Sequence, residues 1–196
     1  HFLNEIGNIP IRGMRLVEVG SAQSLIVVRD GVFASRPSFA DHPAVEVTFA
    51  GARAYCEWAG KRLPTEAEWE FAATTDGQGG KRAYPWGDET PDAAHANLDG
   101  RALGTIDVGA RPAGDNIHGV RQLIGNVWEW TADWYGERYY RISPSKNPMG
   151  SANGKYRVLR GGSWSYLTAA LRGAARGYHD PLGSSSGGFR CVADVE

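Results

Sequence analysis

The sequence predicts a single α+β domain with much irregular structure, and three observations lead to this. A length of 196 residues suits one domain. The 26 Gly are nearly twice the average usage of about 7%, while seven Trp and eight Tyr supply large rings for burial where regular elements are short. Helical spacing of apolar residues stands out in two segments only, and the strand signals are short.

Two helices are predicted in the first half of the chain. Over residues 49–60, apolar side chains recur at three- and four-residue spacing, and Gly60 suits the position after a helix end. Over residues 65–73, Thr65 with Glu68 forms a capping box. The expected core-facing residues of this second helix are Trp69, Ala72 and Ala73. Its Glu66 and Glu70 either face solvent or hold a neighbouring loop.

The strand signals are short and flank the helices. Leu16–Val19 and Leu25–Val28 are predicted to pair as a hairpin, and residues 42–49 alternate between apolar and polar. Central strands are expected over Val127–Trp134 and Lys155–Arg160, with a final strand over 188–192. Residues 74–122 are mostly turn material, and a segment of that length is usually functional or held by an ion.

Charge and hydropathy exclude two classes of partner. With 21 Lys and Arg against 22 Asp and Glu, the net charge is −1, which argues against a nucleic-acid partner. No apolar run is long enough for membrane insertion. The N-terminus lacks the basic stretch followed by an apolar stretch that is typical of a signal peptide. It is interpreted as the middle of a segment, so the chain is expected to be trimmed from a longer one at that end. The compartment of the protein is left open.

Several blocks of sequence resemble the formylglycine-generating enzyme (sulfatase-modifying factor) family. The longest are Lys61 to Glu70 (KRLPTEAEWE), Gly125 to Thr131 (GNVWEWT), Arg157 to Trp164 (RVLRGGSW) and Gly188 to Cys191 (GFRC). The resemblance extends over nearly the whole chain, although the strand region that this family carries ahead of Phe2 is missing. It implies a variant of the C-type lectin fold, with two helices and a small twisted antiparallel sheet.

The resemblance does not fix the activity, because fold does not imply function. Members of the family include copper-dependent oxidases in which two cysteines follow the Gly-Gly-Ser block. Here Tyr166 stands at the first of those positions and no Cys follows before Cys191, so no copper site is expected. Other members are sulfoxide synthases whose iron ligands lie on a separate domain; an oxidoreductase fragment of this kind is the alternative function. A third possibility is an accessory domain that uses the scaffold for partner docking.

The resemblance also implies structural sites. Cys56 and Cys191 occupy positions like those of a structural disulfide in the family; they are either bonded or two buried thiols. Structural Ca²⁺ is expected from backbone carbonyls and carboxylates, the ligands that a hard cation prefers. The implied metal ligands are Asn97 and Leu98 in a first site, and Gln122, Gly125, Val127 and Glu129 in a second. The alternative for Glu129 is a buried carboxylate paired with Arg160 or Arg190.

The segment 165–187 has a biased composition that predicts a ligand-binding surface. Lys, Glu, Gln, Met and Trp are absent from it. Its candidate contact residues, each reachable from an Asn codon by changing adenines alone, are Ser165, Tyr166, Leu167, Ala169, Ala170, Ala175, Gly177, Tyr178, His179, Asp180, Leu182, Ser184, Ser185 and Ser186. Rigid rings among small polar groups are typical of a paratope.

The segment is similar to the variable regions of proteins diversified by retroelements. We therefore expect a non-catalytic protein that binds a protein or small-molecule ligand here, with Tyr166, Tyr178 and His179 as anchors. The alternative is that these are ordinary loop residues, in which Gly and Ser occur because turns of the backbone favour them.

Overall fold

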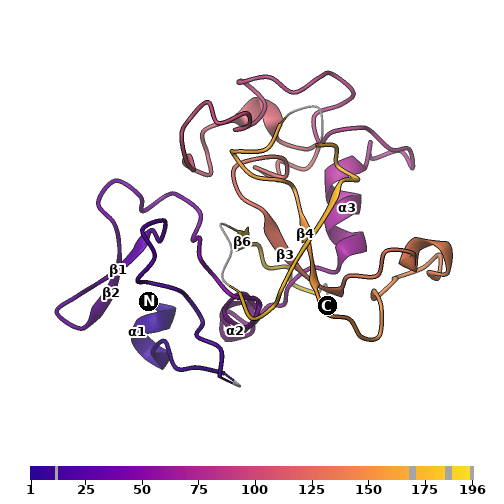
Figure 1. Cartoon of the computed structure of the whole chain (residues 1–196). Coiled ribbons are helices and arrows are strands. Elements are labelled where there is room, and N and C mark those ends of the chain that lie inside the picture. Colours follow the sequence, from indigo (N-terminus) through magenta and orange to yellow (C-terminus); the bar gives the residue numbers. More distant parts are fainter. Residues whose placement is uncertain (12, 168–170, 184–186, 195–196) are drawn as a thin grey trace.

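A four-stranded sheet in the order β5-β4-β3-β6 lies at the centre of the structure (Figure 1). The structure is a computed structural model that describes residues 1–196 except 12, 168–170, 184–186 and 195–196. The helical elements are α1 (Phe2–Ile6), α2 (Phe49–Trp58), α3 (Glu66–Thr74), and the short 3₁₀ turns η1 (Pro112–Gly114) and η2 (Tyr139–Arg141). The strands are β1 (Ile26–Arg29), β2 (Val32–Ser35), β3 (Glu129–Trp134), β4 (Arg157–Arg160), β5 (Arg176–His179) and β6 (Gly188–Phe189).

The sheet is mixed, which corrects the prediction of a wholly antiparallel one. β4 runs antiparallel to both β3 and β5, whereas β6 runs parallel to β3 on its other side. The chain leaves the β5 edge, crosses the sheet and adds β6 beside the start of β3, where the Gly188 N–H donates to the Trp128 carbonyl at 2.6 Å. A crossover connects parallel strands, so β6 keeps the direction of β5, which is also that of β3 because both run antiparallel to β4.

The predicted N-terminal hairpin is wrong in its pairing. β1 pairs with β2, and the turn between them consists of Asp30 and Gly31, which have positive φ values of 52° and 80°. This is the two-residue turn that Asp-Gly favours, and it takes precedence over pairing with the earlier segment. Val17 instead forms an isolated bridge with Val47, so the alternating segment 42–49 makes one bridge before α2 begins.

Both predicted helices are confirmed, and the short α1 is additional. Thr48 caps α2 by accepting from the Gly51 N–H. Thr65 and Glu68 form the predicted capping box at the start of α3, where each side chain accepts from the other's backbone N–H. Trp69 and Ala73 are buried and Ala72 is half-buried, so this face of α3 packs on the sheet as expected.

Two apolar clusters flank the sheet. One gathers Trp130 and Leu159 with α1 and α2, and the other surrounds Trp69 on α3. A disulfide joins Cys56 on α2 to Cys191 after β6, across a sequence separation of 135 residues. No helix among the described residues is long and apolar enough to cross a membrane.

Candidate functional site

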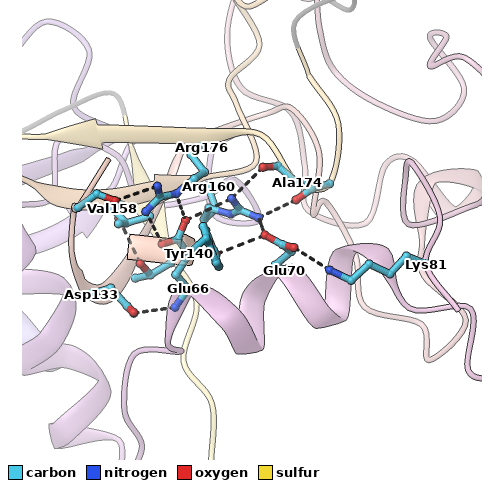
Figure 2. A network of polar contacts seen from close by, with 12 residues as sticks. Glu66, Glu70, Lys81, Asp133, Tyr140, Val158, Arg160, Ala174 and Arg176 are labelled. Carbon is cyan, nitrogen blue, oxygen red and sulfur yellow. Dashed lines mark hydrogen bonds and ion pairs between the residues drawn. The ribbon is translucent and has the colours of Figure 1, made fainter. Parts of the chain in front are cut away.

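A buried network of ion pairs fastens α3 to β4 and β5 (Figure 2). The Arg160 side chain is fully buried, and its guanidinium donates to Glu66 Oε1 at 3.3 Å and to Glu70 Oε2 at 2.9 Å. The Arg176 guanidinium donates to both Glu66 oxygens, at 2.6 and 2.8 Å. The two glutamates are one helical turn apart, which places both on the face of α3 that meets the sheet. Both therefore hold neighbouring segments and do not simply face solvent.

Arg160 also positions the middle of the candidate binding segment. Its two terminal nitrogens donate to the carbonyls of Gly173 and Ala174, at 2.8 and 3.2 Å. Leu171 is buried against the Trp69 cluster, and Gly173 lies where a Cβ would contact the backbone of α3 at 2.9 Å. The segment 171–176 is thus fixed to the scaffold by charge, by packing and by close backbone approach.

The candidate contact residues that the structure describes divide into exposed and half-buried ones. Tyr166 is 46% exposed, Leu167 70%, Tyr178 53% and Leu182 65%. Ser165 is also exposed, and Ala175, Gly177, His179 and Asp180 are half-buried. The remaining candidates, Ala169, Ala170, Ser184, Ser185 and Ser186, lie outside the described residues. The segment is also more regular than expected, because β5 forms within it by pairing with β4.

The three predicted anchors do not form one cluster. Tyr166 packs edge-on against Trp128, with ring centroids 5.1 Å apart, and a Cβ at Gly177 would contact the same indole. His179 is edge-on to the buried Trp130 at 5.9 Å. Tyr178 points to the other face of the sheet, because successive side chains of a strand alternate. The anchors therefore divide between two faces of the edge strand β5.

Two tyrosines outside the predicted segment support Tyr178. Its ring lies 4.4 Å from the centroid of Tyr135 and 5.1 Å from that of Tyr156. Tyr135 follows β3 and Tyr156 precedes β4, so antiparallel pairing brings them together. Tyr135 just after one predicted central strand and Tyr156 inside the other were a signal for this cluster, but only the register shows that it reaches position 178.

The residues implied for calcium lie in two adjacent loops. Asn97 bridges to Gly125, and its carbonyl accepts from the Asn126 N–H at 3.0 Å. The Leu98 carbonyl accepts from the Arg101 N–H at 3.3 Å. Neither loop gathers three His, Cys, Asp or Glu side chains within the described part of the chain. Any cation here would therefore depend mainly on carbonyl and amide oxygens, with Glu129 as the one implied carboxylate.

Glu129 is already ion-paired, and its partner is Arg190. The guanidinium of Arg190 donates to both carboxylate oxygens at 2.6 Å, and Trp69 Nε1 donates at 2.7 Å. The same guanidinium reaches the carbonyls of Arg121 and Gln122, at 3.0 and 3.4 Å. The amide nitrogen and oxygen of Gln122 are buried without a hydrogen-bond partner. The donor set thus fits a cation at Gln122, but Glu129 would have to share its charge with Arg190.

Tyr166 stands where the copper-dependent oxidases of the family carry the first of their two cysteines. Cys56 and Cys191 are the two cysteines of the chain and are bonded to each other, so the oxidised chain has no free thiol. Tyr166 presents a phenol beside Trp128. This surface offers aromatic contact and hydrogen bonding.

Comparisons with known proteins agree with this architecture. The profile of the sulfatase-modifying factor enzyme 1-like domain matches residues 21–195. The chain is 44% identical over 164 residues to the hercynine oxygenase of Mycolicibacterium thermoresistibile, across 80% of this chain and 37% of that protein. It is 46% identical over 176 residues to the formylglycine-generating enzyme of Streptomyces coelicolor, across 80% and 54%. The structure of Treponema denticola variable protein 1 aligns with a TM-score of 0.62 at 21% identity, covering 87% of this chain and 77% of that one.

Fold and comparisons together place the chain. The mixed sheet with α2 and α3 on it defines an α+β domain of formylglycine-generating-enzyme type, with C-type lectin-like neighbours. The chain belongs to the sulfatase-modifying factor enzyme 1-like domain family. It spans about a third to a half of the lengths of the two relatives named above.

Replacing Arg160 tests the buried network. Arg160→Ala leaves Glu66 and Glu70 without that partner and frees the carbonyls of residues 173 and 174. We expect it to lower the free energy of unfolding by about 3–5 kcal/mol, as for other broken buried ion pairs. Denaturant unfolding measures this, with the exposed Arg29→Ala as the matched control. Equal losses in the two variants would contradict the role assigned to Arg160.

Asp133 gives the network a pH dependence. Burial raises the pKa of Asp133 to about 6, with Glu66 and Glu68 adding to the effect, while Arg157 and the Glu66 N–H at 2.6 Å oppose it. The folded state therefore binds this proton more tightly than the unfolded state, and its contribution to stability is lost as the pH rises from about 4 to about 6.5.

Asp133→Asn keeps an acceptor for the Glu66 N–H but removes the titration. We expect wild type to lose at most about 3 kcal/mol more than this variant over that pH range, the free energy that the shift represents. Unfolding curves at several pH values measure the difference, with the exposed Asp41→Asn as control. Parallel stability profiles for wild type and Asp133→Asn would refute this account.

Proposed function

We propose that this domain is a non-catalytic ligand-binding domain whose contact surface is the segment 165–187, diversified as in the variable proteins of retroelements. One observation carries the proposal: the four large apolar candidates (Tyr166, Leu167, Tyr178 and Leu182) are exposed, whereas framework residues between them are tied to the scaffold. Leu171 and Gly173 are buried, and Arg176 is paired with Glu66. The surface can thus change while the framework stays.

The chemistry of the surface suits recognition of a protein or small molecule. Tyr166, Leu167, Tyr178 and Leu182 expose large apolar groups that a ligand can cover. Tyrosine gives rigid contact area together with a hydroxyl, and small residues such as Ser165 add adaptable hydrogen bonding. Because the anchors lie on two faces of an edge strand, a ligand that contacts all of them must wrap around β5.

An oxidoreductase fragment is the second candidate, and the similarity to hercynine oxygenase favours it. In that case Tyr166, Tyr178, His179 and Asp180 would orient a substrate, and a separate domain would supply the iron ligands. A longer chain with an upstream three-histidine helical domain would support this alternative. A near-copy of the coding segment for Trp164 to Arg190, differing only at adenines and lying beside a reverse transcriptase gene, would support diversification.

Randomising the exposed anchors tests the proposal. A displayed library varied at Tyr166, Leu167, Tyr178 and Leu182 is sorted for binding to a purified protein antigen. We expect most members to stay within about 2 kcal/mol of the parental stability, since exposed positions contribute little, and specific binders to emerge.

A matched library uses exposed apolar positions outside the segment, namely Ile9, Leu103, Ile142 and Met149. It should fold equally well and give no binders. The proposal fails if both libraries yield binders equally often, or if randomising the segment unfolds the domain.

We also propose that Ca²⁺ binds at the second implied site through the carbonyls of Gly125 and Val127 and the oxygens of Gln122 and Glu129. The support is the buried, unpartnered Gln122 oxygen in a loop-rich region. Ca²⁺ added to chelator-treated protein should raise the melting temperature, and Gln122→Ala should abolish the rise. A melting temperature that is indifferent to Ca²⁺, or a rise that persists in the variant, would exclude the ion from this site.

A further inference from the structure

We propose that a pocket on the side of α1 and α2 binds an apolar compound that ends in a carboxylate. The pocket has a volume of about 720 Å³, within the range of small-molecule sites. Its lining comes from α1, the β1–β2 hairpin, α2 and the segments 121–129 and 189–191. None of the residues 165–187 lines it, so this inference is independent of the proposed contact surface.

The walls of the pocket are mainly apolar and aromatic. Six side chains from segments far apart in the sequence provide them: Phe2, Phe33, Val47, Tyr55, Val127 and Phe189. The disulfide holds two of these parts together, because Cys56 lies on the same helix as Tyr55 and Cys191 lies close to Phe189. The pocket therefore has a fixed apolar floor that favours a hydrocarbon or aromatic body.

The polar side of the pocket is basic. Lys61, Arg121 and Arg190 line it, against the single carboxylate of Glu129. Arg190 is neutralised by Glu129. Arg121 is more weakly paired, because its Nε lies 3.5 Å from Asp115 Oδ2. Lys61 has no ion-pair partner among the described residues. The pocket thus keeps an excess of positive charge beside its apolar walls, and this charge selects an anion.

Gln122 adds a hydrogen-bond donor that the protein leaves unused. Its Nε2 and Oε1 are both buried without a partner, and the residue lines the same pocket. A buried donor without an acceptor is unfavourable, so an incoming anionic oxygen gains by accepting from Nε2. Apolar walls, basic charge and a free amide together indicate an apolar carboxylate.

Isothermal titration with matched probes tests this. Decanoate is compared with decanol and decylamine, which keep the chain and change the head group. We expect decanoate to bind at least about tenfold more tightly than either, as for a charge-assisted hydrogen bond. A short apolar peptide with a free C-terminus and its C-terminal amide form a second pair. This pair distinguishes a peptide carboxylate from a fatty acid as the source.

Variants assign the binding to this pocket. Lys61→Gln combined with Arg121→Gln should weaken decanoate about tenfold and leave decanol unchanged, while Lys146→Gln, an exposed lysine outside the pocket, should change neither. Ala34→Trp, on an exposed lining position of β2, should block all probes without lowering the melting temperature. The inference is overturned if the three decyl probes bind alike, if none binds, or if Ala34→Trp folds and binds decanoate normally.

Discussion

The arrangement of this domain depends on one buried guanidinium. Arg160 connects Glu66 and Glu70 on α3 to the carbonyls of residues 173 and 174, so a single side chain fixes a helix, the central sheet and the start of β5. Arg176 supplies a second cation for Glu66, and the exposed Lys81 contacts Glu70 at 3.0 Å from the solvent side (Figure 2). Removing any one member leaves a buried charge uncompensated, which is why the network defines the geometry more strictly than apolar packing does.

This constraint explains how a surface can be built from small and aromatic residues without loss of order. In the segment 171–179, Leu171, Gly173 and Arg176 face the scaffold, while the side chain of Tyr178 on the edge strand β5 is exposed. The framework residues have partners that belong to α3, and the exposed residues contact rings such as Tyr135 and Trp128. The side chains that hold this short segment to the scaffold are therefore different from those that it exposes, as the proposed contact surface requires.

Local chemistry was predictable from the sequence, and long-range pairing was not. The Thr65–Glu68 capping box is satisfied within four residues, so its pattern alone identifies the start of α3. The resemblance placed Cys56 near Cys191, and the structure shows the bond. By contrast, the partner of Glu129 was open between Arg160 and Arg190, because charge alone does not distinguish them. The register even places Arg160 directly opposite Glu129, but the Arg160 guanidinium is taken by Glu66 and Glu70 on α3, which leaves Glu129 to Arg190. The parallel β6 and the tyrosines around position 178 depend on the same register.

Trp69 joins the two charged clusters of the molecule. Its Nε1 donates to Glu129, which pairs with Arg190, and its ring lies 5.2 Å from the guanidinium of Arg160. A loosened Trp69 would therefore disturb both the network behind the contact surface and the charged side of the α2 pocket. Both clusters thus contact one buried ring, which links the two regions physically. Rigid support of this kind favours recognition by a preformed surface, with affinity set by the exposed side chains and little ordering cost on binding.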